Sequence, residues 1–410
     1  MPHQVRPTVN SRAHSATMPC MDLTPASPTL VTTGAAIGDL HLDLGEIHPS
    51  GHGGFRLQCS FSDAPIRVTR ATPVPGLLHR GTEKLLEVRD YRSGLMLANR
   101  HDWLSAVTSE VTMALAAESL LGLQVPPRAT WLRTLLCEMN RAMAALSHLM
   151  GVAALPGEGI SPVQMPGAAA REAWQLALER ISGGRLHAMV TRIGGIAADA
   201  PDGWAGDVRR AIDITERELP VLMAAVRQTI SAVLTASGYP PDECIAVLST
   251  ADATGYGVSG PVARASGLDL DLRRDDPPLA YADLQDALTV ITADSGDAAA
   301  RYEVLGNQLA ADLPLIAACL ERLPSGEVSV PLPKVVRAPE GTAYAWLESA
   351  TGITGVFLVS TGETTPWRVR LRTPSYANVQ SMTAAMPGTP LGALPVAIGS
   401  FMFVVGDLDH

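Results

Sequence analysis

The segment from residue 48 to residue 91 carries the most specific pattern of the chain. It begins with His48-Pro49-Ser50-Gly51-His52-Gly53, continues through Gly76-Leu77-Leu78-His79-Arg80-Gly81-Thr82-Glu83-Lys84 and ends with Arg89-Asp90-Tyr91. Glycines interrupt the first motif, and the run Phe55-Arg56-Leu57-Gln58-Cys59 then alternates apolar with polar residues, which is the period of a β-strand. The pattern predicts a glycine-rich loop beside a small N-terminal sheet.

Helical spacing replaces strand spacing after about residue 102. Apolar residues recur at intervals of three and four in two series: Leu104, Val107, Val111 and Leu115, then Trp131, Leu135, Met139 and Met143. Such intervals place side chains on one face of a helix, so they predict a central helical bundle. Beyond Gly238 the pattern is mixed, with a helix near 298–323 and strands near 356–360 and 367–371. The predicted fold class is α+β with helices dominant.

These changes of pattern divide the chain into four regions. Residues 1–38 are rich in Thr, Ser, Pro and Ala and lack the apolar core of a signal peptide, so we expect a disordered or loosely attached extension. Residues 39–101 form the predicted β-rich segment, 102–237 the helical bundle and 238–410 the mixed C-terminal region.

The charge balance excludes nucleic acid as a partner. The 410 residues include 31 Lys and Arg against 41 Asp and Glu, a formal net charge of -10. Such a chain repels phosphate backbones. No stretch approaches the roughly 18 apolar residues of a spanning helix. The longest candidate, 391–405, is interrupted by glycines and Pro395, so we expect buried strands or turns there and no transmembrane segment.

The cysteines predict neither a disulfide framework nor a metal site. They are far apart, with no C-x-x-C pair and no histidine at metal-ligand spacing. An odd number of cysteines indicates free, buried thiols in a reducing compartment. The five are Cys20, Cys59, Cys137, Cys244 and Cys319.

Further motifs follow the first segment in a fixed order. They are Leu120-Leu121-Gly122 with Val125-Pro126-Pro127-Arg128-Ala129, Gly183-Gly184-Arg185-Leu186-His187, Arg192-Ile193-Gly194-Gly195, Arg264-Ala265-Ser266-Gly267, Arg372-Thr373-Pro374-Ser375-Tyr376 and Gly406-Asp407-Leu408-Asp409. In this order they resemble the quinone-site D subunit of the proton-pumping NADH:quinone oxidoreductase, respiratory complex I. That family is related to the nickel-iron hydrogenase large subunit. The resemblance covers about residues 40–410.

The resemblance implies a hydrogenase-like fold and a place in a larger assembly. It implies that the chain and the neighbouring B subunit form a cavity in which quinone, the substrate, receives electrons from an iron-sulfur cluster held by that neighbour. No covalently bound cofactor is implied. The implied partners are the other complex I subunits, especially the B and C subunits and the membrane H subunit. The implied location is peripheral, on the cytoplasmic side of the cell membrane, with NADH bound elsewhere in the complex.

Two positions match the residues that the family places at the quinone headgroup. His52 matches the headgroup histidine, which can give a proton near neutral pH; the alternative role is a backbone anchor in a glycine-rich turn. Trp103 stands where the family has a tyrosine. Its indole N–H donates a hydrogen bond but cannot surrender a proton. His101 could stand in as a donor, although we expect it to be an ordinary surface histidine.

Three more positions complete the expected site. The family pairs its headgroup histidine with an aspartate, and here Glu158 is the nearest carboxylate; a solvated turn residue is the alternative. Arg100 and His187 match the arginine and histidine beside the partner's cluster, where a cation and a hydrogen-bond donor stabilise the reduced state. For Arg100 the alternative is a surface ion pair with Asp102.

Hydrogenase activity is excluded by ligand chemistry. A nickel-iron centre needs two C-x-x-C pairs, and the corresponding segments 98–103 and 401–410 contain no cysteine. The remaining alternative to quinone reduction is a divergent structural paralogue that keeps the fold and partner surfaces. The tryptophan at position 103 and the absence of an aligned aspartate favour that alternative.

Overall fold

The structure, a computed structural model, describes residues 30–32, 40–42, 50, 53–62, 65–155 and 165–410. Two residues of the predicted quinone site, His52 and Glu158, lie outside the described residues, as does most of the extension predicted for residues 1–38.

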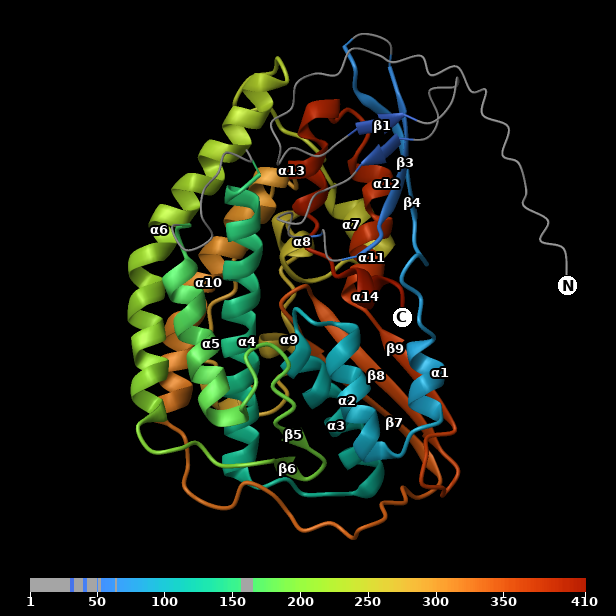
Figure 1. Cartoon of the computed structure of the whole chain (residues 1–410), viewed down its shortest axis with the longest axis vertical. Helices are drawn as coiled ribbons and strands as arrows, with labels where there is room; N and C mark the ends of the chain where they lie inside the picture. The colour runs from blue at the N-terminus through green and yellow to red at the C-terminus, as the bar shows by residue number, and fades with distance from the viewer. Residues whose placement is uncertain (1–29, 33–39, 43–49, 51–52, 63–64, 156–164) are drawn as a thin grey trace, which may run out of the picture.

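Four long helices form a bundle on one side of the molecule (Figure 1). They are α4 (Pro127–Ala153), α5 (Ala168–Ser182), α6 (Trp204–Ala236) and α10 (Ala298–Glu321). Two fully buried tryptophans between α5 and α6 have satisfied indoles: Trp174 donates to Thr215 Oγ1 at 2.9 Å, and Trp204 donates to the Ala177 carbonyl at 2.7 Å. The predicted bundle is confirmed, but α10 comes from the C-terminal region and packs against α4 and α6.

An antiparallel sheet of order β7-β8-β9 covers the second part of the core. Its strands are β7 (Gly341–Glu348), β8 (Ile353–Ser360) and β9 (Arg368–Arg372). Helix α3 (Ala106–Leu121) packs against β7 and β8 and is buried on nearly all sides. The sequence predicted the last two strands and missed β7.

The N-terminal region contains two small antiparallel pairs. Strands β1 (Leu30–Thr32) and β2 (Leu40–Leu42) pair with each other, and β3 (Arg56–Phe61) pairs with β4 (Val68–Val74). The predicted small sheet is therefore present.

The segment expected to be β-rich also contains two helices. They are α1 (Thr82–Glu87) and α2 (Tyr91–His101). Asp90 starts α2, because its side chain accepts the Ser93 N–H at 2.9 Å and satisfies a free donor of the first turn. The β-rich prediction for residues 39–101 was therefore too broad, because strands end at Val74 and residues 82–87 and 91–101 are helical.

Short elements connect the bundle to the sheet. They are β5 (Thr191–Arg192), β6 (Gly195–Ile196), α7 (Thr250–Tyr256), α8 (Gly260–Ala265), α9 (Leu272–Asp275), η2 (Tyr281–Leu284), α11 (Pro374–Gln380), α12 (Met382–Ala385), η3 (Leu391–Ala393), α13 (Leu394–Gly399) and α14 (Val405–Leu408). Residues 391–399, expected as strands or turns, are mostly helical, because prolines at the start of a helix lack only an N–H that is free anyway. Of the thiols expected to be buried, Cys244 is exposed.

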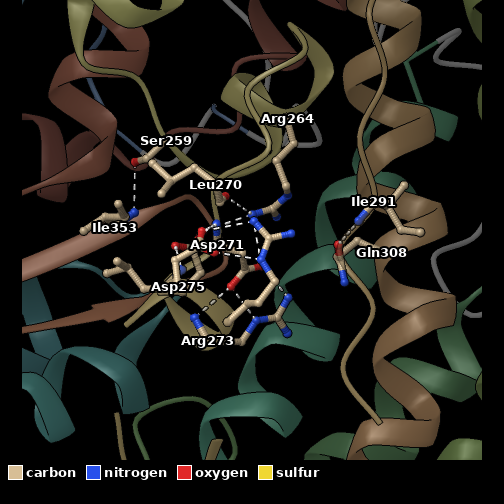
Figure 2. Close-up of polar contacts among 12 residues, drawn as sticks. Ser259, Arg264, Leu270, Asp271, Arg273, Asp275, Ile291, Gln308 and Ile353 are labelled. Carbon is tan, nitrogen blue, oxygen red and sulfur yellow. Dashed lines mark hydrogen bonds and ion pairs between the residues drawn. The ribbon is translucent and has the colours of Figure 1, made fainter. Parts of the chain in front are cut away.

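A buried ionic cluster joins the bundle to the sheet (Figure 2). Arg273 of α9 contacts Asp271 at 2.8 Å, Glu138 of α4 at 3.1 Å and Asp312 of α10 at 2.8 Å. Burial alone would raise the pKa of Asp271, but the guanidiniums of Arg273 and Arg264 hold it well below its usual range. These contacts connect three helices through one fully buried cation.

The cluster extends to the sheet through a second arginine. Arg264 of α8 lies 3.1 Å from Glu348 of β7 and 3.3 Å from Asp271, and Arg141 of α4 donates to the Glu348 carbonyl at 2.5 Å. We call this set the arginine cluster; its members are Arg141, Arg264, Arg273, Glu138, Asp271, Asp312 and Glu348.

In the part of the chain that the structure describes, α6 is the one helix with the length and apolar composition of a membrane span. This is weak evidence, because long helices in soluble cores meet the same criterion. Here α6 packs along α5, α10 and α4 (Figure 1).

Candidate functional site

The last residues of the chain, 403–410, form a segment on which distant motifs meet; we call it the C-terminal segment. Asp409 fixes the loop of the second motif, because its two carboxylate oxygens accept the N–H groups of Gly76 and Leu78, each at 2.7 Å. His79 Nδ1 lies 3.1 Å from the Asp409 carbonyl oxygen. The loop at residues 76–79 is therefore held by the end of the chain.

The residue that follows His52 lies against the same segment. A Cβ atom on Gly53 would lie 3.1 Å from Val405 Cβ, so the backbone approaches α14 closely at this point. Two residues on, the rings of Phe55 and Phe403 have centroids 4.8 Å apart. The glycine-rich motif thus ends beside α14, and the role of His52 itself stays a prediction.

The Trp103 side chain packs against Gly406, the residue of α14 that follows Val405. This side chain is half-buried and packs against the main core. A Cβ atom on Gly406 would overlap both the Trp103 ring and the His101 carbonyl oxygen. A glycine is therefore required at position 406 for the indole to approach the C-terminal segment this closely.

His101, expected at the surface, is buried. Its exposed fraction is 3%, and its Nδ1 lies 2.7 Å from the Ala98 carbonyl oxygen, within hydrogen-bond distance. Burial lowers the pKa of His101 to about 4, so the ring is neutral near pH 7. The surface interpretation was wrong because α14, some 300 positions along the chain, covers the end of α2.

Two carboxylates that the sequence did not single out lie beside this histidine. Asp102 Oδ1 accepts the N–H groups of Leu104 at 3.2 Å and Ser105 at 3.0 Å, and Asp407 Oδ2 accepts the N–H of Ser375 at 3.1 Å. Burial raises the pKa of Asp102 to about 6, and burial together with the charge of Asp102 raises that of Asp407 well above its usual range. Asp407 stood inside a quoted motif and Asp102 was named only as an ion-pair partner for Arg100, but nothing in their local pattern indicated burial.

Arg100 and His187, predicted to share a site, lie close together. Arg100 is exposed and its Nη2 lies 3.4 Å from Met189 Sδ. Burial and then the charge of Arg100 lower the pKa of the half-buried His187. Glu110 of α3 holds the intervening loop by accepting the N–H groups of Met189 and Thr191 at 2.8 and 3.1 Å.

The alternative role for Arg100, an ion pair with Asp102, is not among the ion pairs of the described residues. Asp102 is fully buried, whereas Arg100 projects into solvent. Within the described part of the chain, no three His, Cys, Asp or Glu side chains are placed to hold a metal ion.

Comparison with known proteins identifies the family. Residues 159–337 and 332–410 match the family model of the 49 kDa subunit of respiratory-chain NADH dehydrogenase. A protein of Salinispora tropica, named as copy 2 of the NADH-quinone oxidoreductase D subunit, is 48% identical over 375 residues, covering 90% of this chain and 93% of that protein. A Streptomyces coelicolor protein named as copy 1 of the same D subunit is 46% identical over 394 residues, covering 94% of this chain and all of that protein.

The fold agrees with a solved respiratory complex. A chain of the membrane-bound sulfane sulfur reductase, an archaeal respiratory membrane complex, superimposes with a TM-score of 0.78 at 30% identity, covering 88% of this chain and 96% of that chain. The chain described here belongs to the 49 kDa subunit family of respiratory-chain NADH dehydrogenase, as a D subunit of NADH-quinone oxidoreductase.

Proposed function

We propose that this chain and the B subunit together form the quinone-reduction cavity of a membrane-attached, proton-translocating NADH:quinone oxidoreductase. The observation that carries the proposal is the meeting of three motifs on the C-terminal segment: Gly53 beside Val405, Trp103 on Gly406, and the loop at 76–79 on Asp409. A site built from such distant parts of the chain is positioned by the fold as a whole.

The chemistry assigns a separate task to each residue. Quinone takes up two electrons from the iron-sulfur cluster of the B subunit and two protons to become quinol. His52 gives one proton to a headgroup oxygen. Trp103 donates a hydrogen bond from its indole N–H and holds the headgroup without giving up that proton. Glu158 is assigned as the carboxylate that orients His52.

Arg100 and His187 are assigned to the surface that faces the cluster of the B subunit. A cation and an imidazole next to a reduced cluster stabilise its added electron. The exposure of Arg100 and its closeness to His187 support this assignment, because a group that faces a partner protein is solvent-exposed in the free chain.

The assembly carries over from the family. We assign contacts with the B and C subunits and with the membrane H subunit, and a peripheral position on the cytoplasmic side of the membrane. One face of α6 packs along three other helices of the bundle, and its exposed face carries charged residues such as Arg209, Asp213 and Arg217, which supports a peripheral role.

A structural paralogue is the second candidate function. Trp103 favours it, because a tryptophan removes the proton donor that the family places at the headgroup. Relatives named as numbered copies of the D subunit, 1 and 2, are consistent with a second copy that assembles without efficient chemistry.

Turnover of the assembled complex separates the two functions. His52→Ala should lower the kcat of NADH-driven quinone reduction by roughly 100-fold, the usual contribution of a general acid. NADH oxidation by ferricyanide, which bypasses the quinone site, should not change. His14→Ala, in the N-terminal extension, is the matched control.

Trp103→Tyr supplies the opposite test. It should raise quinone turnover if the wild-type site is active but weakened. If both the wild-type and the Trp103→Tyr complexes assemble yet reduce no quinone, the chain is the structural paralogue.

A further inference from the structure

Three titratable side chains lie together next to Trp103. Asp102 and Asp407 are fully buried and His101 is 3% exposed. Asp102 precedes Trp103 in the chain, and Asp407 follows Gly406, on which the Trp103 ring lies. We call His101, Asp102 and Asp407 the buried triad.

One oxygen of each carboxylate lacks a hydrogen bond. Asp102 Oδ2 and Asp407 Oδ1 have no hydrogen-bond partner among the described residues, although both atoms are inaccessible to solvent. The basic atom nearest to Asp407 Oδ1 is His101 Nε2, at 3.6 Å. Buried polar atoms without partners cost free energy, and a proton on Asp407 Oδ1 that is donated toward His101 Nε2 would relieve that cost for Asp407.

The hydrogen bond of the imidazole determines which of its nitrogens can accept a proton. The Ala98 carbonyl can only accept, so His101 Nδ1 carries a hydrogen and donates it over 2.7 Å. In the neutral ring the lone pair is then on Nε2, the atom that faces Asp407. A proton on Asp407 Oδ1 therefore has an acceptor on the imidazole.

The surrounding charges do not compensate two carboxylates. Arg372 of β9 acts on Asp407 from the side of the sheet, but its guanidinium donates to the Ile353 and Gly257 carbonyls. Arg80 and His410 act on His101 and disfavour a charged imidazole. Two adjacent carboxylates in a buried site repel each other, so their doubly ionised state is high in free energy without a proton or a cation between them.

We propose that the buried triad binds one proton at neutral pH and delivers it to the reduced quinone, in place of the phenolic proton that Trp103 cannot supply. The delivery step rests on the proposed function. Because burial keeps His101 neutral near pH 7, the proton resides on a carboxyl group of the triad, chiefly that of Asp407.

The reaction balances with this proton. Quinone receives two electrons from the partner's cluster, one proton from His52 and one from the triad, and becomes quinol. An O–H bond forms on the headgroup as the O–H bond of the triad breaks. Two carboxylates and a neutral imidazole remain, and the triad takes a proton from water before the next turnover.

Infrared spectroscopy of the assembled complex tests the bound proton without any turnover. The wild-type complex should show the carbonyl stretch of a protonated carboxylic acid at neutral pH. This band should disappear in Asp407→Asn, which removes the carboxyl that holds the proton, and should shift in frequency in Asp102→Asn, which removes the neighbouring carboxylate. It should persist in Asp269→Asn, which removes an exposed carboxylate that pairs with Arg274 outside the triad.

Other spectra contradict the proposal. A band that is unchanged in both triad variants shows that the proton is bound elsewhere. If neither variant assembles, the infrared spectrum of the wild-type complex with carbon-13-labelled aspartate tests whether an aspartate holds the proton. A label-shifted acid band that persists when the buried Asp312 is replaced by Asn supports the triad, and the absence of any such band contradicts it.

Kinetics test the delivery step separately. Asp407→Asn should lower the kcat of quinone reduction by roughly 100-fold with an unchanged KM for quinone. Wild-type turnover in this variant overturns delivery by the triad and leaves the proposed function intact. A wild-type complex that shows the infrared band but reduces no quinone instead overturns the proposed function.

Discussion

The arginine cluster and the buried triad are both sets of charged side chains in the core, yet they differ in how their charge is balanced. In the arginine cluster three guanidiniums face four carboxylates, and Asp271 is held ionised. In the triad two carboxylates meet a neutral histidine, and burial raises the pKa of both. Burial is nearly the same in the two places, so the partner groups determine the difference.

The comparison separates a structural network from a titratable one. A guanidinium cannot lose its proton in a protein, so the arginine cluster has a fixed charge on its cations and holds helices together. An aspartate pair beside a histidine exchanges protons within the physiological range. The second arrangement lies next to Trp103, at the proposed quinone site.

The largest expected effect comes from breaking the arginine cluster. Arg273→Met leaves three buried carboxylates without their central cation and should destabilise the fold by about 3–5 kcal/mol. Arg274→Met is the matched control, because Arg274 is the next residue in the chain and its guanidinium pairs with Asp269 and Asp275 in solvent. We expect the control to cost under about 1 kcal/mol. Thermal unfolding of the assembled complex measures both changes, and equal losses would contradict the comparison.

The pH dependence of local stability tests the triad. Its carboxylates have folded-state pKa values above their unfolded values, so the folded chain binds more protons and loses stability as pH rises from about 4 through about 6. The loss is on the order of 3 kcal/mol. Asp102→Asn should remove the part of this slope that Asp102 contributes and stabilise the segment at neutral pH. Hydrogen exchange of peptides covering 101–105 and 405–410, corrected for intrinsic rates, measures it; an unchanged slope would contradict the assignment.

A smaller effect is expected where Trp103 meets the C-terminal segment. Gly406→Ala places a methyl group into the indole ring and should cost about 1–3 kcal/mol, the usual cost of overpacking. Trp103→Leu should recover part of that loss in the double variant, because it removes one of the two overlaps. Thermal unfolding of the four complexes gives the coupling. Strict additivity would show that the two residues do not touch.

The smallest effect concerns Arg100 and His187. Arg100→Met removes a nearby positive charge, so the pKa of His187 should rise by less than about one unit, as expected for exposed charges. Lys84→Met, in the preceding helix, is the control cation. Nuclear magnetic resonance of labelled histidine follows the titration of His187. A pKa that changes no more than in the control would show that Arg100 does not act on His187.

Sequence pattern predicted those parts of the fold in which one face is buried along a whole element. The bundle helices and strands β8 and β9 repeat apolar residues over many turns or pairs, so local spacing reports their burial. The pattern could not show that α10 joins the bundle, since that contact depends on the path of the chain.

The candidate site was harder to predict from the sequence than the fold, because its burial also depends on contacts between distant segments. His101 stands between Arg100 and Asp102, a context typical of a surface, and only the packing of α14 buries it. The triad likewise combines residues that are about 300 positions apart in the chain. The motifs predicted the closeness of Arg100 and His187, whereas His52 and Glu158 lie outside the described residues.

Photoaffinity labelling tests the central claim, that quinone binds against the C-terminal segment, most directly. An azido-quinone irradiated in the assembled complex and mapped by mass spectrometry should label Trp103 or peptides covering 50–55 and 401–410, and excess quinone should compete. Labelling confined to other subunits, with these peptides unmodified, would contradict the account.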